Sequence, residues 1–574
     1  MSIARYKSIV NAYKFVPLLL FHLKALAVKL WAMLCYKRSL TMTSKQYLKE
    51  EREIKELNMS TLEKPEKIVH STINREKMLS YLIKLVVWLQ PHLWLVLLGI
   101  TSELVYFFYL LHDFPVISHS LELTDMGAIS GFSHFGFLKF LVALSFLFIL
   151  FGFAWWDVRR FQDRATLWTI LGFGGVFALT TIFVYPVTAI DIFNYIGYSL
   201  IMLQHGANPM TALPSQFIAD PVIRVVSQPF INVPSPYGPL AQVIQALPVV
   251  IGGRNVLASL LLTKFMFSTV LIFGAFFVYK ILSHIAPRFA LPGTLALAWN
   301  PFVLLEYSAN SHNDIVMMFF IILAVFALIK KHHVLALTLI TASALIKFAS
   351  LPLIPLFFFY SFIHQPTWKE KILYTLESSV ASLSLLLATF IPFWAGSQTL
   401  QRFLNETQGQ LYSFSMFLQD LSSEMISSHQ ATQVGWALFV ICFFYALWLC
   451  LRDISHMLQG CAITMFALLA FSATYIQPWY LIWPFVLAIL IPQTEVSLAA
   501  ILLLYAATLV ELVHAYIFPW GAYNDQSAFS IVNSVVYFIM FFPPMLFLLV
   551  SRFRHIFSQP PSSLEDDIFD PLSP

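Results

Sequence analysis

The sequence predicts an all-α protein, a bundle of helices that crosses a membrane many times. Of its 574 residues, 59% are hydrophobic and only 11% are charged. A soluble protein carries about 25% charged residues, so this chain has too few to cover a water-facing surface of its size. The apolar residues also fall into stretches about as long as a bilayer is thick. The net charge is only +4, and we expect no nucleic-acid partner.

The apolar stretches predict the membrane spans. A span needs about 20 apolar residues, and the shortest stretches are the weakest candidates, so we expect about 13–14 spans. The stretches lie near residues 85–110, 138–156, 167–187, 257–283, 290–308, 314–330, 333–349, 350–364, 374–395, 433–452, 459–475, 480–493, 497–518 and 529–552.

The basic residues predict the orientation of these spans. Lysine and arginine collect in cytoplasmic loops. Counting alternate crossings puts every basic cluster on one side of the membrane. The clusters are Arg159-Arg160 with Arg164, Lys280 to Arg288, Lys330-Lys331, Lys369 with Lys371, Arg452, and Arg552 with Arg554. We therefore expect a multi-pass protein with both termini in the cytoplasm.

The two ends of the chain differ from its centre. Residues 1–78 are predicted to form a cytoplasmic N-terminal region. Its apolar stretch is interrupted by Lys24 and Lys29, which predicts an amphipathic helix lying in the membrane interface. Residues 79–556 form the multi-span membrane domain, which also carries the candidate catalytic residues. Residues 557–574 form an acidic tail that we expect to be disordered.

Ionisable residues gather at the non-cytoplasmic ends of the spans. Such a residue at mid-bilayer costs roughly 2.5–3.5 kcal/mol and is a functional candidate. Side chains near span ends can also reach the headgroups, but this does not explain why carboxylates and histidines avoid the inner ends. The asymmetry predicts a polar cavity that opens to the non-cytoplasmic face. The residues are Asp191, Lys264, Glu306, His312, Asp314, Lys347, Glu511 and His514.

The segment Asp191-Ile-Phe-Asn-Tyr195 stands where the third span leaves the membrane. Asp191, Asn194 and Tyr195 are spaced three and four apart, which places them on one face of a helix. An aspartate before an apolar run can also be a helix N-cap. Two proline-containing turns follow, His205-Gly-Ala-Asn-Pro209 and Ser235-Pro-Tyr-Gly-Pro239. Their aromatic and imidazole groups matter only if this loop folds over a pocket.

A second group of polar residues lies between Asn300-Pro301 and Asp314. Glu306 lies within this segment. Asn310 and Ser311 are typical turn residues, but no turn requires His312 beside Asp314. Further along, Lys347 precedes a helix break. It can reach the headgroups, or it can hold a phosphate as a point charge. Trp479 and Tyr480 precede Trp483, which an aromatic belt at the membrane interface also explains.

Taken in this order, the segments resemble the GT-C polyprenyl-phosphate-sugar-dependent glycosyltransferases, and most of all the bacterial alpha-mannosyltransferases that elongate cell-envelope glycans. The resemblance runs from about the third span through Lys347 and more loosely to Trp479. It rests on Asp191-Ile-Phe-Asn-Tyr195, His205-Gly-Ala-Asn-Pro209, Ser235-Pro-Tyr-Gly-Pro239, Asn300-Pro301 and His312-Asn313-Asp314.

The resemblance implies a GT-C-like fold and a hexosyltransferase of the bacterial cell membrane. The donor is a polyprenyl-phosphate-linked sugar, mannose by likeness, and the acceptor is a glycan or a lipid-linked glycan on the non-cytoplasmic face. Transfer inverts the anomeric configuration, with Asp191 in the place of the general base. Many relatives have paired acidic residues here, whereas this chain has Asp191 with Asn194. A need for a divalent metal therefore stays open, and no cofactor is expected.

The chemistry of such a transfer assigns roles to the other residues. Lys347 and His312 are candidates to meet the charge that develops on the leaving phosphate. Stacking of an aromatic ring would orient the sugar. No metal ligand is predicted, and membrane lipids are expected as partners. The candidate substrate-binding residues are Asn194, Tyr195, His205, Tyr237, Glu306, His312, Asn313, Asp314, Lys347, Trp479 and Tyr480.

A transporter or flippase of lipid-linked sugars is the alternative function. Its site should lie near the middle of the membrane on broken helices, often within an inverted repeat. The sequence shows no convincing repeat, and its ionisable residues gather at one face. A polymerase or ligase of lipid-linked glycans ranks third, because its outer loops should hold more arginines than Arg224, Arg254 and Arg402.

Overall fold

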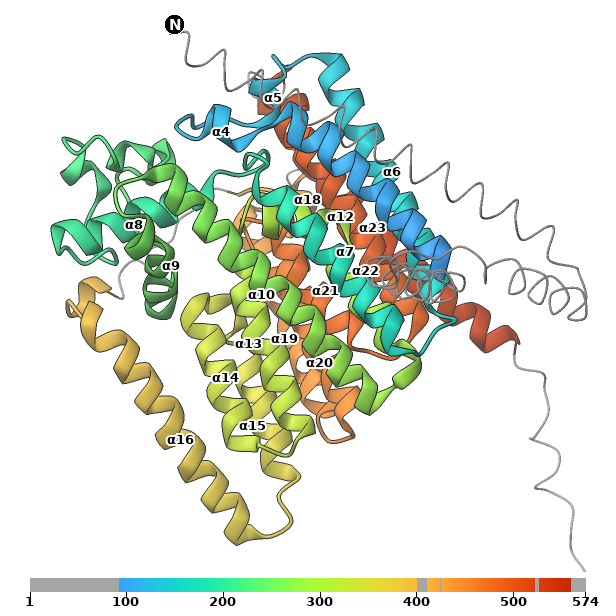
Figure 1. The fold of residues 1–574 in the computed structure, drawn as a ribbon. Coiled ribbons are helices and arrows are strands. Elements are labelled where there is room, and N and C mark those ends of the chain that lie inside the picture. Colours follow the sequence, from blue (N-terminus) through green and yellow to red (C-terminus); the bar gives the residue numbers. More distant parts are fainter. Residues whose placement is uncertain (1–91, 400–409, 424, 522–525, 559–574) are drawn as a thin grey trace, which may run out of the picture. The chain divides into compact units, whose positions relative to one another are not determined.

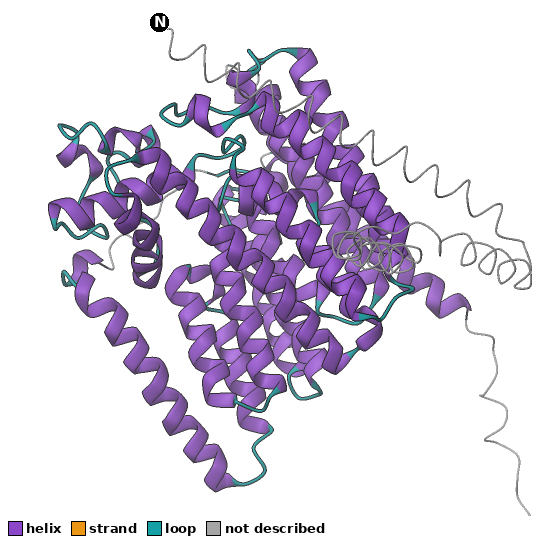
Figure 2. Ribbon diagram, in the orientation of Figure 1, coloured by secondary structure: helices purple, strands orange, loops and turns teal. Residues whose placement is uncertain are grey.

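A computed structural model describes residues 92–399, 410–423, 425–521 and 526–558. Within these ranges the regular elements are all helices, as Figures 1 and 2 show. The all-α prediction is therefore confirmed. The predicted N-terminal region 1–78 and acidic tail 557–574 lie almost wholly outside the described residues, so their predicted character stays a prediction.

Nine of the described helices are long and apolar enough to cross a membrane. They show that the protein is a multi-pass integral membrane protein. They are His92–Leu111, α6 (His134–Val158), α7 (Arg164–Ile182), α10 (Val256–Ile285), α16 with its last turn (Trp368–Phe393), α19 (Ser428–Leu449), α20 with its last turn (Ile454–Ser472), α22 with its last turn (Thr494–Ile517), and Ser527–Ser551 within α23 (Gln526–Ser558).

The other five predicted spans are helical but shorter or bent. Pro287–Ala298, which ends in α11 (Ala290–Ala298), and Pro301–Ala309 form a pair bent by 45°, which raises the number of spans in the described residues to ten if the pair counts as one. Four helices are shorter than a span, namely α13 (Asp314–Ile329), α14 (His333–Ile346), Phe348–Ile363, which contains α15 (Leu353–Ile363), and Pro478–Ile489, which ends in α21 (Ile482–Ile489). The predicted positions hold, and nine or ten of the described helices are long enough to be full spans.

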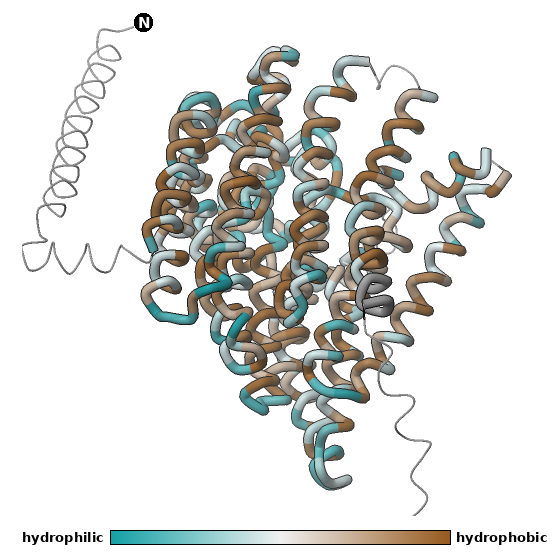
Figure 3. Tube along the Cα trace, turned by 90° about the vertical axis from the view of Figure 1, so that its right-hand side faces the viewer, coloured by the Kyte–Doolittle hydropathy of each residue, from teal (hydrophilic) through white to brown (hydrophobic). Residues whose placement is uncertain are grey.

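Of the short helices, α13 and α21 lie in the interior of the bundle. α13 packs against α10, α14 and α21, so most of its side chains are buried by protein. A helix surrounded by protein does not need to match the bilayer thickness, because its ends can be satisfied by neighbouring helices. At the periphery, large apolar side chains such as Phe153 and Trp156 on α6 are exposed. Apolar residues follow the helices along their length in Figure 3, while hydrophilic residues gather where the chain turns.

Four helices end in a short π-helical segment, a feature often found at functional sites. The segments are Tyr106–Leu111, Leu305–Ala309, Leu468–Ser472 and Val513–Ile517. All four stand at the end of the bundle where α8 (Asp191–His205) begins. The loop after the first packs against the chain before Asp191, since Val116 N–H donates to the Phe183 carbonyl at 2.8 Å.

Residues 206–255 form a folded loop at this same end. It holds three short 3₁₀ turns, Pro214–Phe217, Ile223–Val225 and Gln228–Phe230, followed by α9 (Pro239–Gly252). α9 is apolar but has only 14 residues, fewer than a membrane span needs. The loop packs against α8 and α10, so it forms part of the wall around the first residues of α8.

Candidate active site

Asp191 is the first residue of α8. Ile190 occupies the N-cap position and makes no side-chain cap hydrogen bond, so the explanation of Asp191 as a helix cap is wrong. The Asp191 side chain is 22% exposed, although every residue from Ile192 to Ile201 is buried. Its carboxylate is therefore a reachable group on an otherwise buried helix, placed where the helix dipole favours a negative charge.

The ring of His312 lies between two carboxylates. Its Nδ1 is 3.7 Å from Asp191 Oδ2, and its Nε2 is 3.3 Å from Glu306 Oε2. His312 is fully buried, and neither ring nitrogen makes a hydrogen bond. The indole of Trp479 stacks on the imidazole, with centroids 4.1 Å apart and planes 13° apart. This stack fixes the ring plane and keeps the imidazole between the two carboxylates.

Glu306 is held inside the π-helical segment Leu305–Ala309. Its carboxylate accepts hydrogen bonds from Thr188 Oγ1 and Asn310 Nδ2, each at 2.8 Å. Ser311 follows in the left-handed backbone region, at a φ of 59°, which is strained for a residue other than glycine. The turn brings the His312 N–H back to the Glu306 carbonyl at 3.0 Å. The local backbone thus places His312 beside Glu306.

Asp314 and Lys347 form an ion pair at the start of α13 and the end of α14. Lys347 Nζ donates to Asp314 Oδ1 at 2.8 Å, and the indole Nε1–H of Trp483 donates to the same oxygen at 2.6 Å. Asp314 is 1% exposed and Lys347 is 19% exposed. The ammonium group also lies over the Tyr480 ring, 4.1 Å from its centroid. Lys347 therefore joins a buried carboxylate to the accessible part of the site.

Tyr237 reaches the same site from the loop before α9. Its ring meets that of Tyr195 edge to face, with centroids 5.0 Å apart, and the Tyr195 hydroxyl accepts from the Asn313 N–H at 3.4 Å. Gly238 seats this turn on the end of α14, because its N–H donates to the Ile346 carbonyl at 3.1 Å. A Cβ at Gly238 would stand 2.1 Å from the Leu345 carbonyl oxygen, so no side chain fits there.

Two predicted site residues are not brought to this cluster. Asn194 is buried, and its Oδ1 accepts from the N–H and the hydroxyl of Ser227, at 2.9 and 3.0 Å. It therefore ties the loop 206–255 to α8. His205 ends α8, about 20 Å from Asp191 along the helix axis. Its Nε2 is 3.1 Å from Asp220 Oδ2.

The contacts of Asp220 continue into the loop. Arg254 Nη2 lies 2.6 Å from Asp220 Oδ1. This hydrogen bond, helped by those from Val222 N–H and His205, lowers the pKa of Asp220 to about 2. The loop is thus held to the far end of α8 by a carboxylate that stays ionised over the physiological range.

The structure adds residues that the sequence did not assign to the site. Thr188 donates to Glu306, and no sequence pattern distinguishes it from other threonines. Trp483 is 4% exposed and bonded to Asp314, so the aromatic-belt interpretation is wrong for it. Its spacing of four residues from Trp479 was the available signal. Lys264 is fully buried and donates to the carbonyls of Val184 and Ala309, which joins the end of α7 to the π-helical segment.

The arrangement presents two accessible groups of opposite charge, backed by buried polar groups. Asp191 can take a proton from a bound hydroxyl group, and Lys347 can meet an anion. Among the residues that the structure describes, no group of three or more His, Cys, Asp or Glu side chains is arranged to hold a metal ion. The other members of the cluster are in place to position these two groups rather than to meet a ligand first.

Comparison with known proteins defines the class of this membrane enzyme. Residues 114–362 match the family described as alpha-(1->6)-mannopyranosyltransferase, N-terminal domain, and residues 408–547 match the MptB C-terminal domain. No curated protein matches the chain. The two matched regions cover about two thirds of the sequence and include the whole cluster from Asp191 to Tyr480. The protein is therefore a membrane glycosyltransferase of the GT-C-like kind.

More specifically, the chain belongs to the alpha-(1->6)-mannopyranosyltransferase family and is a membrane mannosyltransferase. The resemblance drawn from the sequence motifs is confirmed at this level. As a transferase, the protein uses a sugar donor and an acceptor. Membership of this family favours an enzyme over the transporter or flippase that the sequence left as the alternative.

Proposed function

We propose that the protein transfers a mannosyl residue from a polyprenyl-phosphate donor to a glycan or lipid-linked acceptor on the non-cytoplasmic face of the membrane. The observation that carries this proposal is the contrast in exposure within the cluster. Asp191 and Lys347 are 22% and 19% exposed, whereas Glu306, His312 and Asp314 are almost fully buried. A general base and a cation are thus the groups that reach substrates.

The proposed reaction is a direct displacement that inverts the anomeric carbon. A bond forms between the acceptor oxygen and the anomeric carbon as the bond from that carbon to the phosphate oxygen breaks. Asp191 takes the proton of the acceptor hydroxyl, a step that contributes about 10²–10⁴ in rate. The lipid phosphate leaves with the bonding electron pair, and Lys347 stabilises the charge that develops on it.

The buried residues would prepare these two groups for the reaction. His312 stands 3.7 Å behind Asp191 and is itself backed by Glu306, so the imidazole can steady the carboxylate before and after it takes the proton. The ring of Trp479 is already stacked on His312 and that of Tyr480 on Trp483. Tyr237, whose ring meets Tyr195 only edge to face, is therefore the aromatic side chain best placed to hold the sugar. In this proposal Asn194 and His205 hold the loop rather than the substrate.

An assay of the purified protein tests the donor. We expect transfer of mannose from beta-linked polyprenyl-phosphate-mannose to an acceptor glycan, with an alpha-linked product. Polyprenyl-phosphate-glucose and GDP-mannose serve as controls for the sugar and for the lipid carrier. Product linkage is read by nuclear magnetic resonance. Equal transfer from GDP-mannose, or a beta-linked product, would contradict the proposed donor or the inverting mechanism.

A labelling experiment tests the face. Leu121 is 76% exposed and belongs to the loop that packs against the chain just before Asp191. In a cysteine-free background, Leu121→Cys in right-side-out vesicles is expected to react with an impermeant maleimide. The control His332→Cys, at an exposed position beyond the opposite end of α13, should react only after permeabilisation. The reverse pattern would place Asp191 on the cytoplasmic side.

A further inference from the structure

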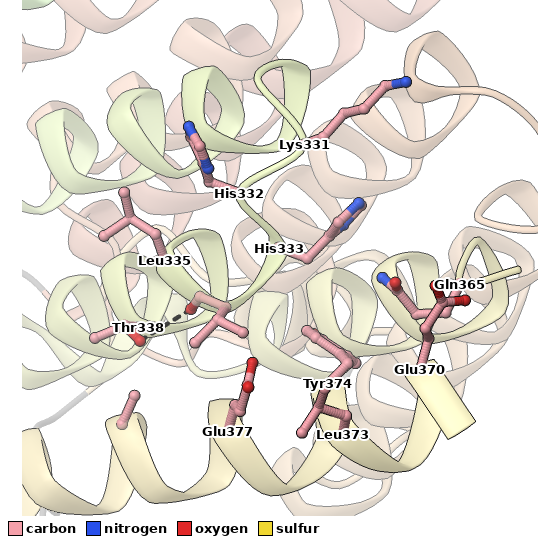
Figure 4. A pocket seen from close by; sticks show the side chains of 12 residues that line it. Lys331, His332, His333, Leu335, Thr338, Gln365, Glu370, Leu373, Tyr374 and Glu377 are labelled. Carbon is pink, nitrogen blue, oxygen red and sulfur yellow. Dashed lines mark hydrogen bonds between the residues drawn. The ribbon is translucent and has the colours of Figure 1, made fainter. Parts of the chain in front are cut away.

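Of the lysines in the described chain, only Lys264 is fully buried. A lysine near the end of a span normally places its ammonium group at the membrane surface. Lys331, for example, is exposed at an open cavity of about 710 Å³ between α14 and α16 (Figure 4). Lys264 lies instead within α10, and its side chain is 0% exposed. An ionisable side chain inside a membrane helix is costly, so it is a candidate for a function.

Both partners of the Lys264 ammonium group are backbone carbonyls. Nζ donates to the carbonyl oxygens of Val184 and Ala309, two residues that are themselves fully buried. In the described chain neither oxygen accepts from a backbone N–H, because Val184 lies past the end of α7 and Ala309 ends a π-helical segment. A buried carbonyl without a donor is costly. One side chain therefore satisfies two polar groups that the helices leave unpaired.

The two carbonyls belong to the two chain segments that build the candidate active site. Val184 lies seven residues before Asp191, in the connection between α7 and α8, and Ala309 lies three residues before His312. Asp191 and His312 do not hold each other directly, because His312 Nδ1 is 3.7 Å from Asp191 Oδ2 and makes no hydrogen bond. Their separation is therefore set by the backbone segments that carry them, and Lys264 ties these segments together.

We propose that Lys264 is a positioning residue for the transfer reaction and fixes the separation of Asp191 and His312 through its two hydrogen bonds. The inference rests on the proposed function, in which Asp191 is the base. Lys264 is enclosed by protein and touches no substrate. Its charge does not act directly on the base either. The charged groups that act on Asp191 are His312, Lys347, Asp314 and Glu306.

Ser268 offers a matched control. It lies one turn from Lys264 on α10 and is 3% exposed. Its Oγ is 2.6 Å from the Oγ of Ser308, which belongs to the same π-helical segment as Ala309. When Ser268 is changed, Ser308 still donates to the Ala178 carbonyl at 3.0 Å. Ser268→Ala thus removes a buried contact between the same two elements without freeing a carbonyl beside the site.

Kinetics of the purified protein in lipid nanodiscs test the proposal. Lys264→Met removes both hydrogen bonds and keeps a similar side-chain volume. We expect kcat per folded protein to fall by about 100-fold, since a displacement of about 1 Å at the reacting groups costs that factor. KM for the donor should not change, because Lys347 and Tyr237 are untouched. Ser268→Ala should leave both constants unchanged. The substrate is whichever polyprenyl-phosphate sugar the unmodified protein turns over, so an error in the proposed sugar does not affect the result.

The pH profile separates positioning from a loss of folded protein. Partial burial raises the pKa of Asp191, and the neighbouring His312 lowers that pKa. When His312 moves away in Lys264→Met, the pKa of Asp191 rises. The acid limb of kcat/KM then moves to higher pH, because the base must be ionised to act. A purely structural loss would lower the amount of active protein and leave the acid limb in place.

Three results in Lys264→Met or its control would overturn the proposal. They are full kcat in Lys264→Met, an unmoved acid limb in that variant, and an equal loss of kcat in Ser268→Ala. Lys264→Leu repeats the test with a smaller apolar side chain. If neither apolar variant folds, Lys264 is required for folding rather than for positioning, and the proposal is overturned as well.

Discussion

Replacement of Asp191 by asparagine is expected to abolish mannosyl transfer while the protein still folds. Asparagine keeps the size and the hydrogen-bonding capacity of the side chain but cannot accept the proton of the attacking hydroxyl. The loss should amount to about 10²–10⁴ in kcat, the usual contribution of a positioned general base. The measurement is the rate of transfer by purified protein reconstituted in lipid nanodiscs, with KM for the donor determined in parallel.

The matched control is Asp113→Asn. Asp113 has a side-chain exposure of 23%, close to the 22% of Asp191, and it pairs with Lys139 on the loop side of the bundle. This variant should retain full activity. If Asp191→Asn keeps its activity while its unfolding temperature is unchanged, Asp191 is not the base. A rise in KM without a fall in kcat would give Asp191 a binding role instead.

The second large effect is expected at the pair of Lys347 and Asp314. Lys347→Met removes the cation proposed to meet the leaving phosphate, so transfer should fall by about 10²–10³. It also leaves the carboxylate of Asp314, which is 1% exposed, without its ionic partner. Breaking such a buried pair costs about 3 kcal/mol of folding stability. Activity assays and thermal unfolding in nanodiscs measure the two losses separately.

A double variant separates catalysis from stability. In Lys347→Met combined with Asp314→Asn, the buried charge is gone, and the new amide oxygen can still accept from Trp483. We expect most of the lost stability to return while transfer stays as low as in Lys347→Met. If the double variant regains activity, Lys347 acts only by neutralising Asp314. If Lys347→Met unfolds no earlier than the unmodified protein, the pair does not stabilise the fold.

The positions of the helices could be predicted because the bilayer sets the length of a lipid-facing helix. The lengths were harder to predict where protein replaces lipid, as around α13 and α21, because a buried helix is free of that limit. The ionisable members of the site could also be predicted, since Asp191, Glu306 and Asp314 would be costly in a membrane without a function or a partner.

The partners of these residues could not be predicted in the same way. Lys347 and Asp314 are 33 residues apart, and Thr188 and Glu306 are 118 apart, so only the tertiary fold brings them together. Proximity in the sequence was also a poor guide to position in the site. His205 shares α8 with Asp191, yet the length of the helix carries it to the other end. Asn194 lies near Asp191 on α8, but its side chain turns toward Ser227.

The π-helical segments change the direction in which the side chains at the end of a helix point. Such a segment contains one more residue than an α-helical turn, and each residue takes up about 100° around the axis. In the helix that carries Glu306, the side chains beyond Leu305 are therefore rotated relative to those before it. The main part of the helix can therefore direct one set of side chains toward lipid or neighbouring helices. Its last turn can direct a different set toward the substrates. The residues that anchor the helix and the residues that take part in the reaction can then change independently within one helix.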